Sequence, residues 1–158
     1  MDKLLLLLQQ NARLTTAQLA ATLGVDEKEI NVRMAALEAE GLVRGYTALI
    51  DWEKAGTDHV TAHIELKVTP RRDSGFDAIA ETIAAMDEVE SVSLMSGGYD
   101  LSVAVVGKTF QEVAMFVARR LSPLEGVVAT STHFVLKRYK EKGVVFAGEP
   151  RDERGVIA

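Results

Sequence analysis

Lys28, Asn31 and Arg33 lie within six residues of one another and carry groups that proteins use to contact DNA. A lysine or arginine can neutralise a phosphate or donate to guanine, and an asparagine amide can pair with adenine. Glu27 and Glu29 lie among them and would repel a phosphate, which favours the alternative of a solvated helix face. These residues indicate a candidate DNA-reading segment whose acidic start opposes binding.

Arg13, Thr15, Thr16 and Arg44 are further candidates for phosphate contacts, from the sequence on either side of that segment. Thr15 has an equally good alternative role, because Thr15 and Gln18 have the spacing of a capping box. A threonine at the first position of such a box bonds a free backbone amide at the start of a helix. The sequence leaves both roles open for Thr15.

A second polar cluster is the turn Ser96-Gly97-Gly98-Tyr99-Asp100. Its glycine amides can bind a ligand carboxylate while Asp100 binds an α-amino group, a combination that suits a zwitterion. The plainer interpretation is a hairpin turn in which the glycines supply positive φ. Thr130, Ser131 and Thr132 form a polar group between apolar residues, and they either face the same pocket or pair across strands.

The three histidines of the chain are His59, His63 and His133. His63 and His133 fall on segments expected to be neighbouring strands, which raises the question of a metal site. They have no fixed ligand spacing, however, and ordinary histidines of a sheet surface or interface are the favoured interpretation. We therefore expect neither a metal nor another cofactor.

The first 50 residues predict three helices followed by a small wing. Leucines repeat at helical spacing within residues 4–11, and capping boxes with later glycines predict helices within residues 15–24 and 26–41. Two short helices joined by a turn that contains glycine form the helix-turn-helix pattern. Two extended runs around a glycine within residues 42–50 predict the wing.

The rest of the chain alternates between strands and helices. Apolar residues at every second position of the segment 60–68 are typical of a half-buried strand. The elements follow in the order β-α-β-β-α-β, at residues 60–69, 76–86, 89–95, 101–106, 110–121 and 127–139. This is the order of a ferredoxin-like unit, whose helices cover one face of the sheet and leave the other to water or to a second subunit.

These elements predict an α+β chain in four parts. We expect a winged helix-turn-helix DNA-binding domain at residues 1–50 and a linker at 51–59. A ferredoxin-like ligand-sensing and oligomerisation domain is expected at residues 60–146, followed by a loose C-terminal tail at 147–158.

Composition limits the class of protein. The chain has no cysteine, which excludes disulfides and thiolate metal sites. Its net charge of −5 argues against strong nucleic-acid binding, although acids and bases are nearly balanced in the first 50 residues. The run from Leu4 to Leu8 is too short to cross a membrane and lacks the flanks of a signal peptide. We therefore expect a cytoplasmic protein with no membrane partner.

The domain order and several short motifs resemble the Lrp/AsnC family, the feast/famine regulators. The matching motifs are Asn11-Ala12-Arg13-Leu14-Thr15, Leu19-Ala20, Arg33, Leu37-Glu38, Gly41-Leu42-Val43, Gly45-Tyr46-Thr47-Ala48-Leu49-Ile50-Asp51, Gly98-Tyr99-Asp100-Leu101 and the strand around Thr132 to Lys137. Each motif alone is weak, but in this order they make the resemblance specific.

The resemblance implies a transcriptional regulator and no enzyme activity. It implies homodimers that assemble further to tetramers or octamers, and whose heads bind a roughly palindromic operator in double-stranded DNA. It also implies that an amino acid or similar small effector binds between ferredoxin-like (RAM-type) domains, near the turn at Gly98. Arg33 matches a family position that is often held in a structural ion pair.

Two other functions fit the same architecture. Tetrapyrrole decarboxylases share it, but they need basic and histidine side chains gathered in a cleft between domains, and the histidines here are scattered. A partner-type regulator, which assembles with a paralogue and binds DNA weakly itself, fits the acidic residues Glu27 and Glu29. We expect effector-modulated DNA binding in which several heads act together, because each head carries few bases.

Overall fold

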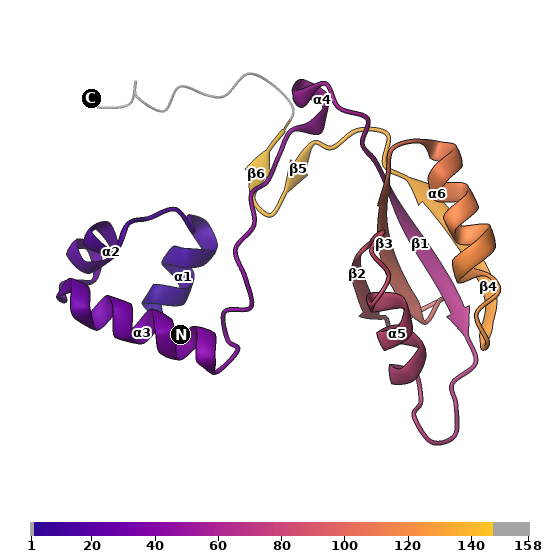
Figure 1. Ribbon diagram of the computed structural model, residues 1–158, viewed down its shortest axis with the longest axis horizontal. Coiled ribbons are helices and arrows are strands. Elements are labelled where there is room, and N and C mark those ends of the chain that lie inside the picture. The colour runs from indigo at the N-terminus through magenta and orange to yellow at the C-terminus, as the bar shows by residue number, and fades with distance from the viewer. Residues whose placement is uncertain (1, 147–158) are drawn as a thin grey trace. The chain divides into compact units, whose positions relative to one another are not determined.

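The computed structural model describes residues 2–146 and shows two compact units (Figure 1). The first unit ends at Leu49 and the second begins at Ile50. The tail expected at residues 147–158 lies outside the described residues. Within residues 2–146, no helix is both long enough and apolar enough to cross a membrane.

The first unit contains three helices, close to the predicted positions: α1 (Lys3–Gln10), α2 (Thr16–Leu23) and α3 (Glu27–Ala39). Each helix begins after a residue whose side chain accepts a hydrogen bond from an amide of the first turn. These caps are Asp2, Thr15 and Asp26. Capping satisfies amides that have no partner within the helix, so these residues fix where each helix starts.

The three helices pack around one small core. Its buried side chains are Leu4, Leu8, Leu19, Ala20, Ile30 and Leu37. Full burial of a leucine or isoleucine side chain is worth about 1.5–3 kcal/mol. Gly24 ends α2 in the left-handed region, at φ 71°, and this lets the chain turn at once into α3. The helix-turn-helix predicted from the sequence is therefore confirmed.

The predicted wing does not form as a pair of strands. Residues 45–51 are extended and pair with no strand of the described chain. A two-stranded hairpin with no third strand or helix to cover it is only marginally stable, and the side chains of residues 45–48 are exposed. Tyr46 instead donates its hydroxyl to Glu38 of α3, with an oxygen–oxygen distance of 2.9 Å.

The second unit is built on an antiparallel sheet with the strand order β2-β3-β1-β4. Its main elements are β1 (Val60–Val68), α5 (Asp77–Ala84), β2 (Val89–Leu94), β3 (Leu101–Gly107), α6 (Phe110–Phe116), the π-helical turn η1 (Val117–Leu121) and β4 (Val127–Phe134). This order and pairing confirm the ferredoxin-like α+β fold.

The helices cover one face of this sheet, which holds the larger core. Alternate residues of the two central strands are buried there against the helices: Ala62, Ile64, Leu66, Leu101, Val103 and Val105 from the strands, and Ile83, Val113, Phe116 and Leu121 from α5, α6 and η1. Because side chains alternate along a strand, the remaining residues point to the other side. We call this side the open face; on β1, β3 and β4 it carries Thr61, His63, Glu65, Lys67, Ser102, Ala104, Val106, Ala129, Ser131 and His133.

The last strand is shorter than predicted. The sequence predicts a strand over residues 127–139, but β4 ends at Phe134. Val135 still donates its amide to Thr61 at 2.9 Å, but β1 begins at Val60 and offers later residues no partner. The chain then forms a separate hairpin from β5 (Lys140–Glu141) and β6 (Val144–Val145).

The segment expected as a linker is partly ordered by a single helical turn. Residues 51–59 include α4 (Trp52–Ala55), which is capped by Asp51 and ended by Gly56 at φ 67°. The β5–β6 hairpin lies near α4 in Figure 1, and residues on either side of the hairpin line one pocket together with residues of α4. This junction belongs to the second unit.

Candidate nucleic-acid interface and ligand site

The solvent face of α3 is the first candidate site. Ile30 and Leu37 hold the opposite side of the helix in the core. Since successive residues are rotated by about 100° around a helix, the face directly away from the core carries a short series of residues. They are Lys28, Asn31, Val32 and Ala35, and all four are exposed.

This face combines polar and apolar groups suited to the edges of base pairs. Asn31 can pair with adenine, and Lys28 can donate to guanine or neutralise a phosphate. Val32 is 69% exposed, and together with Ala35 it offers methyl groups that can contact the methyl group of thymine. Sequence reasoning missed Val32, although a β-branched apolar residue outside the i, i+4, i+7 core positions of a helix was a usable signal.

The two acidic residues at the start of α3 lie beside this face rather than on it. By helix geometry, Glu27 and Glu29 are each rotated by about 100° from Lys28, in opposite directions. Glu29 also lies 3.8 Å from a guanidinium nitrogen of Arg33. Its charge is therefore partly balanced within the protein, whereas Glu27 remains as the stronger source of repulsion.

Arg33 is held in an ion pair within the first unit. Its Nη2 lies 2.8 Å from Oδ1 of Asp2, the residue that caps α1, and its side chain is 34% exposed. The guanidinium thus joins the start of α1 to the middle of α3. This contact agrees with the structural role that the family resemblance implies, and it leaves Arg33 less available to DNA than Lys28.

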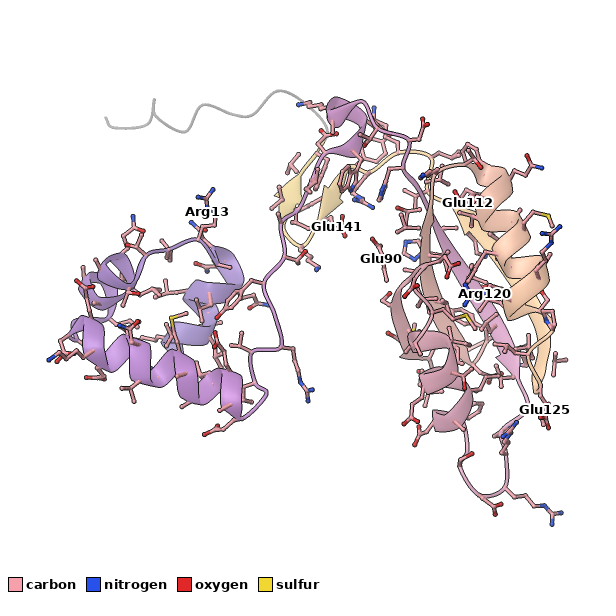
Figure 2. The ribbon with its side chains drawn as sticks, in the orientation of Figure 1. Arg13, Glu90, Glu112, Arg120, Glu125 and Glu141 are labelled. Carbon is pink, nitrogen blue, oxygen red and sulfur yellow. The ribbon has the colours of Figure 1, made fainter. Side chains whose placement is uncertain are left out.

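The other predicted phosphate contacts surround the ends of α2 and α3. Thr15 is the cap of α2: its hydroxyl accepts from the Gln18 amide at 3.2 Å, while the Gln18 side chain accepts from the Thr15 amide at 2.9 Å. The hydroxyl of Thr16 lies 3.4 Å from the side-chain oxygen of Asn31, so it links the two helices. Arg13 is exposed and projects away from the helices in Figure 2.

Arg44 and Tyr46 follow the end of α3. The Arg44 side chain donates to the carbonyl of Gly41 at 2.9 Å and remains exposed. The pKa of the Tyr46 hydroxyl is raised above the usual 10.0 by partial desolvation, and then by the hydrogen bond to Glu38 and the charge of that carboxylate. Both side chains therefore already have a partner near the end of the helix.

The predicted effector turn at residues 96–100 is tied to the end of β1. Asp100 donates its amide to the Leu66 carbonyl at 2.9 Å, and its Oδ2 accepts from the Val68 amide at 2.8 Å. Lys67 donates to the Gly98 carbonyl at 3.3 Å. One carboxylate oxygen of Asp100 is thus used to hold the turn, which supports the plainer interpretation of that residue.

The glycines of this turn differ from each other in conformation. Gly97 has a positive φ of 143°, whereas Gly98 does not have a positive φ. A Cβ atom added at either position would meet no atom within 4 Å, so both backbones border open space. Ser96 is exposed and Tyr99 is half-buried, and these groups remain accessible to a ligand or a neighbouring subunit.

The two threonines predicted to share this site lie on the other side of β1. Thr130 pairs with Leu66 and Thr132 pairs with Ile64, which places both on the helix-covered face of β4. The turn leads into β3, and β3 and β4 flank β1, so about two strand spacings, or about 10 Å, separate the threonines from the turn. Within one chain, these threonines and the turn do not adjoin.

The histidines of the sheet lie together on the open face. His63 is directly opposite His133 in the register of β1 and β4. The Nε2 of His133 lies 3.6 Å from Glu65 and 3.2 Å from the Ser131 hydroxyl. Across residues 2–146, no group of three or more histidine or acidic side chains has an arrangement that would hold a metal ion.

Comparison with known protein families matches nearly the whole described chain. Residues 3–44 match the family described as winged helix-turn-helix DNA-binding. Residues 61–145 match the family described as the Lrp/AsnC ligand binding domain. The two matches correspond to the two units of the structure.

Individual relatives are transcriptional regulators. The chain is 45% identical over 157 residues to the uncharacterized HTH-type transcriptional regulator YugG of Bacillus subtilis, which covers 99% of this chain and 95% of that protein. It is 26% identical to the proline dehydrogenase transcriptional activator of Rhizobium radiobacter, covering 90% of each chain.

Solved structures share the same fold. The transcriptional regulator NMB0573 of Neisseria meningitidis, solved as a complex with L-Met, is similar with a TM-score of 0.71 and 27% identity, covering 89% of this chain and 93% of that chain. The structure of E. coli AsnC is similar with a TM-score of 0.67 at 22% identity, covering 89% of this chain and 95% of that chain, which supports the fold.

Proposed function

The chain belongs to the Lrp/AsnC family of HTH-type transcriptional regulators, and we propose that it binds double-stranded DNA through the solvent face of α3 in response to a small amino-acid-like effector. The observation that carries the proposal is the composition of that face. Lys28, Asn31 and Val32 point away from the core, and the nearby acids lie to its sides. The face can therefore approach base edges in the major groove by its N-terminal half.

The remaining predicted contacts have supporting roles in this proposal. Arg13, Thr16 and Arg44 are near the ends of α2 and α3 and are proposed to contact phosphates. Thr15 and Arg33 are proposed to act indirectly, because the first caps α2 and the second pairs with Asp2.

DNA binding is tested with a fluorescently labelled duplex from the region upstream of the protein's own gene. Asn31→Ala is expected to weaken binding by about tenfold, because a bidentate contact with a base is worth about 1–3 kcal/mol. Lys28→Gln is expected to lower the slope of log affinity against log salt by about one for each head. Lys3→Gln removes a charge from α1 that is also exposed, and it is the matched control. Equal effects of all three substitutions would contradict the proposed interface.

The open face of the sheet is proposed to form the homodimer. It consists of small and polar side chains, yet Thr61 and Ala104 are buried there even within one chain. Such a face can pack against the same face of a second copy around a twofold axis. Further assembly to tetramers or octamers is expected, and light scattering after size-exclusion chromatography measures the state directly.

The effector is proposed to be an amino acid or a related metabolite bound at the turn Ser96–Asp100. One regulator of similar structure was solved with L-Met. Because Thr130 and Thr132 are separated from the turn within one chain, we propose that the complete site needs a second copy to bring such groups together. Adding each of the twenty amino acids to the DNA-binding assay tests this, and an unchanged affinity with all of them would reject it.

The relatives favour a regulator over the enzyme that the architecture also allows. Those named above are regulators rather than enzymes, which does not favour a tetrapyrrole decarboxylase. We propose that the chain has no catalytic role, acts in the cytoplasm and binds DNA on its own account.

A further inference from the structure

The second unit contains a pocket that the proposed function does not use. It lies between residues 50–61 and residues 135–146 and has a volume of about 130 Å³. A cavity needs about 10–15 Å³ to hold one water molecule, so this pocket has room for a small organic molecule of about ten non-hydrogen atoms. Thr61 borders the pocket near the start of β1, whereas the turn at residues 96–100 contacts the end of β1, about 20 Å away at about 3.3 Å per residue. The two sites are therefore distinct.

The walls of this pocket are held in place by contacts within the unit. The rings of Trp52 and His59 stack with centroids 4.8 Å apart and an angle of 18° between planes. The Thr61 hydroxyl is 3.4 Å from Nε2 of His59, and Thr61 is only 6% exposed. Leu136 and Phe146 add apolar surface from the other side. The pocket is thus preorganised and combines an apolar surface with polar and charged side chains.

Charges of opposite sign line the two sides of the pocket. Lys137 and Arg138 come from the segment after β4, and Asp51 and Glu53 come from α4 and its cap. Arg138 is already paired with Glu141 at 2.8 Å and lies over the ring of Phe146. Lys137 is exposed, and its ammonium lies 5.3 Å from the centroid of the exposed Tyr139 ring. It has no acidic partner within 4.0 Å among the described residues, so a ligand carboxylate would not have to displace an ion pair to reach it.

We propose that this pocket binds a small carboxylate with a branched or aromatic apolar body. The carboxylate would bind Lys137 and Arg138, and the apolar body would pack between Trp52, Leu136 and Phe146. An α-amino group, where the ligand has one, would lie toward Asp51. The site is separate from the proposed effector turn and does not depend on it.

The position of the pocket gives its occupant a route to the DNA-binding unit. Ile50 and Asp51 line the pocket and directly follow Leu49, the last residue of the first unit. A ligand that holds these two residues restricts the chain that joins the units. This consequence, unlike the binding itself, rests on the proposed function.

Trp52 makes the proposal directly testable, because it is the single tryptophan of the chain and it lines the pocket. The full-length protein is titrated without DNA, using L-leucine in one series and its deaminated analogue 4-methyl-2-oxopentanoate in another. Each is expected to give a saturable change in Trp52 fluorescence, with a matching heat in calorimetry. No saturable change with either probe at millimolar concentration would overturn the proposal.

Three substitutions assign the signal to the pocket. Lys137→Gln is expected to weaken both probes about tenfold, as expected for loss of a charge-assisted hydrogen bond. Lys142→Gln removes the same charge from the nearby hairpin turn, outside the pocket, and is expected to leave both affinities unchanged. Asp51→Asn keeps an N-cap residue and is expected to weaken L-leucine but not the oxo acid.

The outcomes separate this site from the effector turn. Calorimetric binding with no change in Trp52 fluorescence, and with equal affinity in Lys137→Gln and wild type, would place the ligand elsewhere and overturn the proposal. Because these measurements contain no DNA, failure here leaves the test of the α3 interface intact.

Discussion

Arg33 of α3 donates to Asp2, the residue that caps α1, with an Nη2–Oδ1 distance of 2.8 Å. The same Oδ1 accepts from the Leu4 amide at 2.9 Å, so one carboxylate oxygen both caps α1 and joins it to α3. The side chains of the pair are 34% and 33% exposed, which limits the contribution of charge alone. The cap and the ion pair together fix how α1 lies on α3.

Replacing Asp2 should therefore loosen α1 more when the cap is lost than when only the charge is lost. Asp2→Ala is expected to cost about 1–2 kcal/mol of local stability, because it removes a helix cap and an ion pair. Asp2→Asn retains a capping oxygen and is expected to cost less than half as much. Hydrogen exchange of the α1 amides in the full chain measures both, and equal costs would contradict the capping role.

The capping box of α2 leads to a second prediction, which separates the two roles left open for Thr15. Thr15→Ala is expected to cost about 1 kcal/mol in the stability of α2, whereas Thr15→Ser should cost little because serine caps equally well. Thr15→Gly removes the hydroxyl but costs only a few tenths of a kcal/mol of capping free energy. If Thr15 acts only as a cap, the DNA affinity of Thr15→Gly should match wild type, and a several-fold loss of affinity without loss of stability would identify Thr15 as a phosphate contact.

The third prediction concerns Glu27 and Glu29, the acidic residues beside the solvent face of α3. Glu27→Gln should raise DNA affinity by about two- to fivefold at low salt, because it removes a charge that would repel the approaching phosphates. Among the described residues, Glu27 is exposed and has no ion-pair partner that would balance this charge. Glu29→Gln should raise it less, since Glu29 also lies 3.8 Å from Arg33. Titrations of the same labelled duplex compare the two variants. A larger gain from Glu29→Gln would show that the Arg33 contact does not balance that charge.

Local signals in the sequence were sufficient for the elements of the first unit. Capping-box spacing predicted helices that start near Thr15 and Asp26, with a glycine ending the first, and in the structure Thr15 and Asp26 cap the helices and Gly24 ends α2. The Asp2–Arg33 pair spans 31 positions in the sequence. The residue types alone do not identify such a partner; only the position of Arg33 in a family pattern indicated a structural ion pair.

The elements that were misjudged depend on partners distant in the sequence. Residues 127–139 have the residue types of one strand, but the strand ends at Phe134 because β1 supplies partners only from Val60 onward. The predicted wing had strand-like residues and no third strand or helix to stabilise a hairpin. The shared site of Thr130 and Thr132 with the turn at residues 96–100 stays a prediction: the sheet order places β1 between the threonines and the turn within one chain, so the site would need a second copy.

The fourth prediction is a pH effect at the end of α3, where Tyr46 donates to Glu38 at 2.9 Å. The pKa of Tyr46 is raised by partial desolvation and by Glu38, so the folded state holds the phenol proton more tightly than the unfolded state. The resulting stability is fully present below the usual pKa of 10.0 and is lost as pH rises through the higher pKa of the folded state. Glu38→Gln removes the carboxylate charge and should lower the pKa of Tyr46 toward 10.0, while Glu40→Gln, which removes an exposed acid outside this bond, should leave it unchanged. Titration of the Tyr46 ring resonances by NMR, assigned by comparison with Tyr46→Phe, measures the shift. An equal decrease in both variants would attribute the raised pKa to the general acidity of the segment rather than to the bond with Glu38.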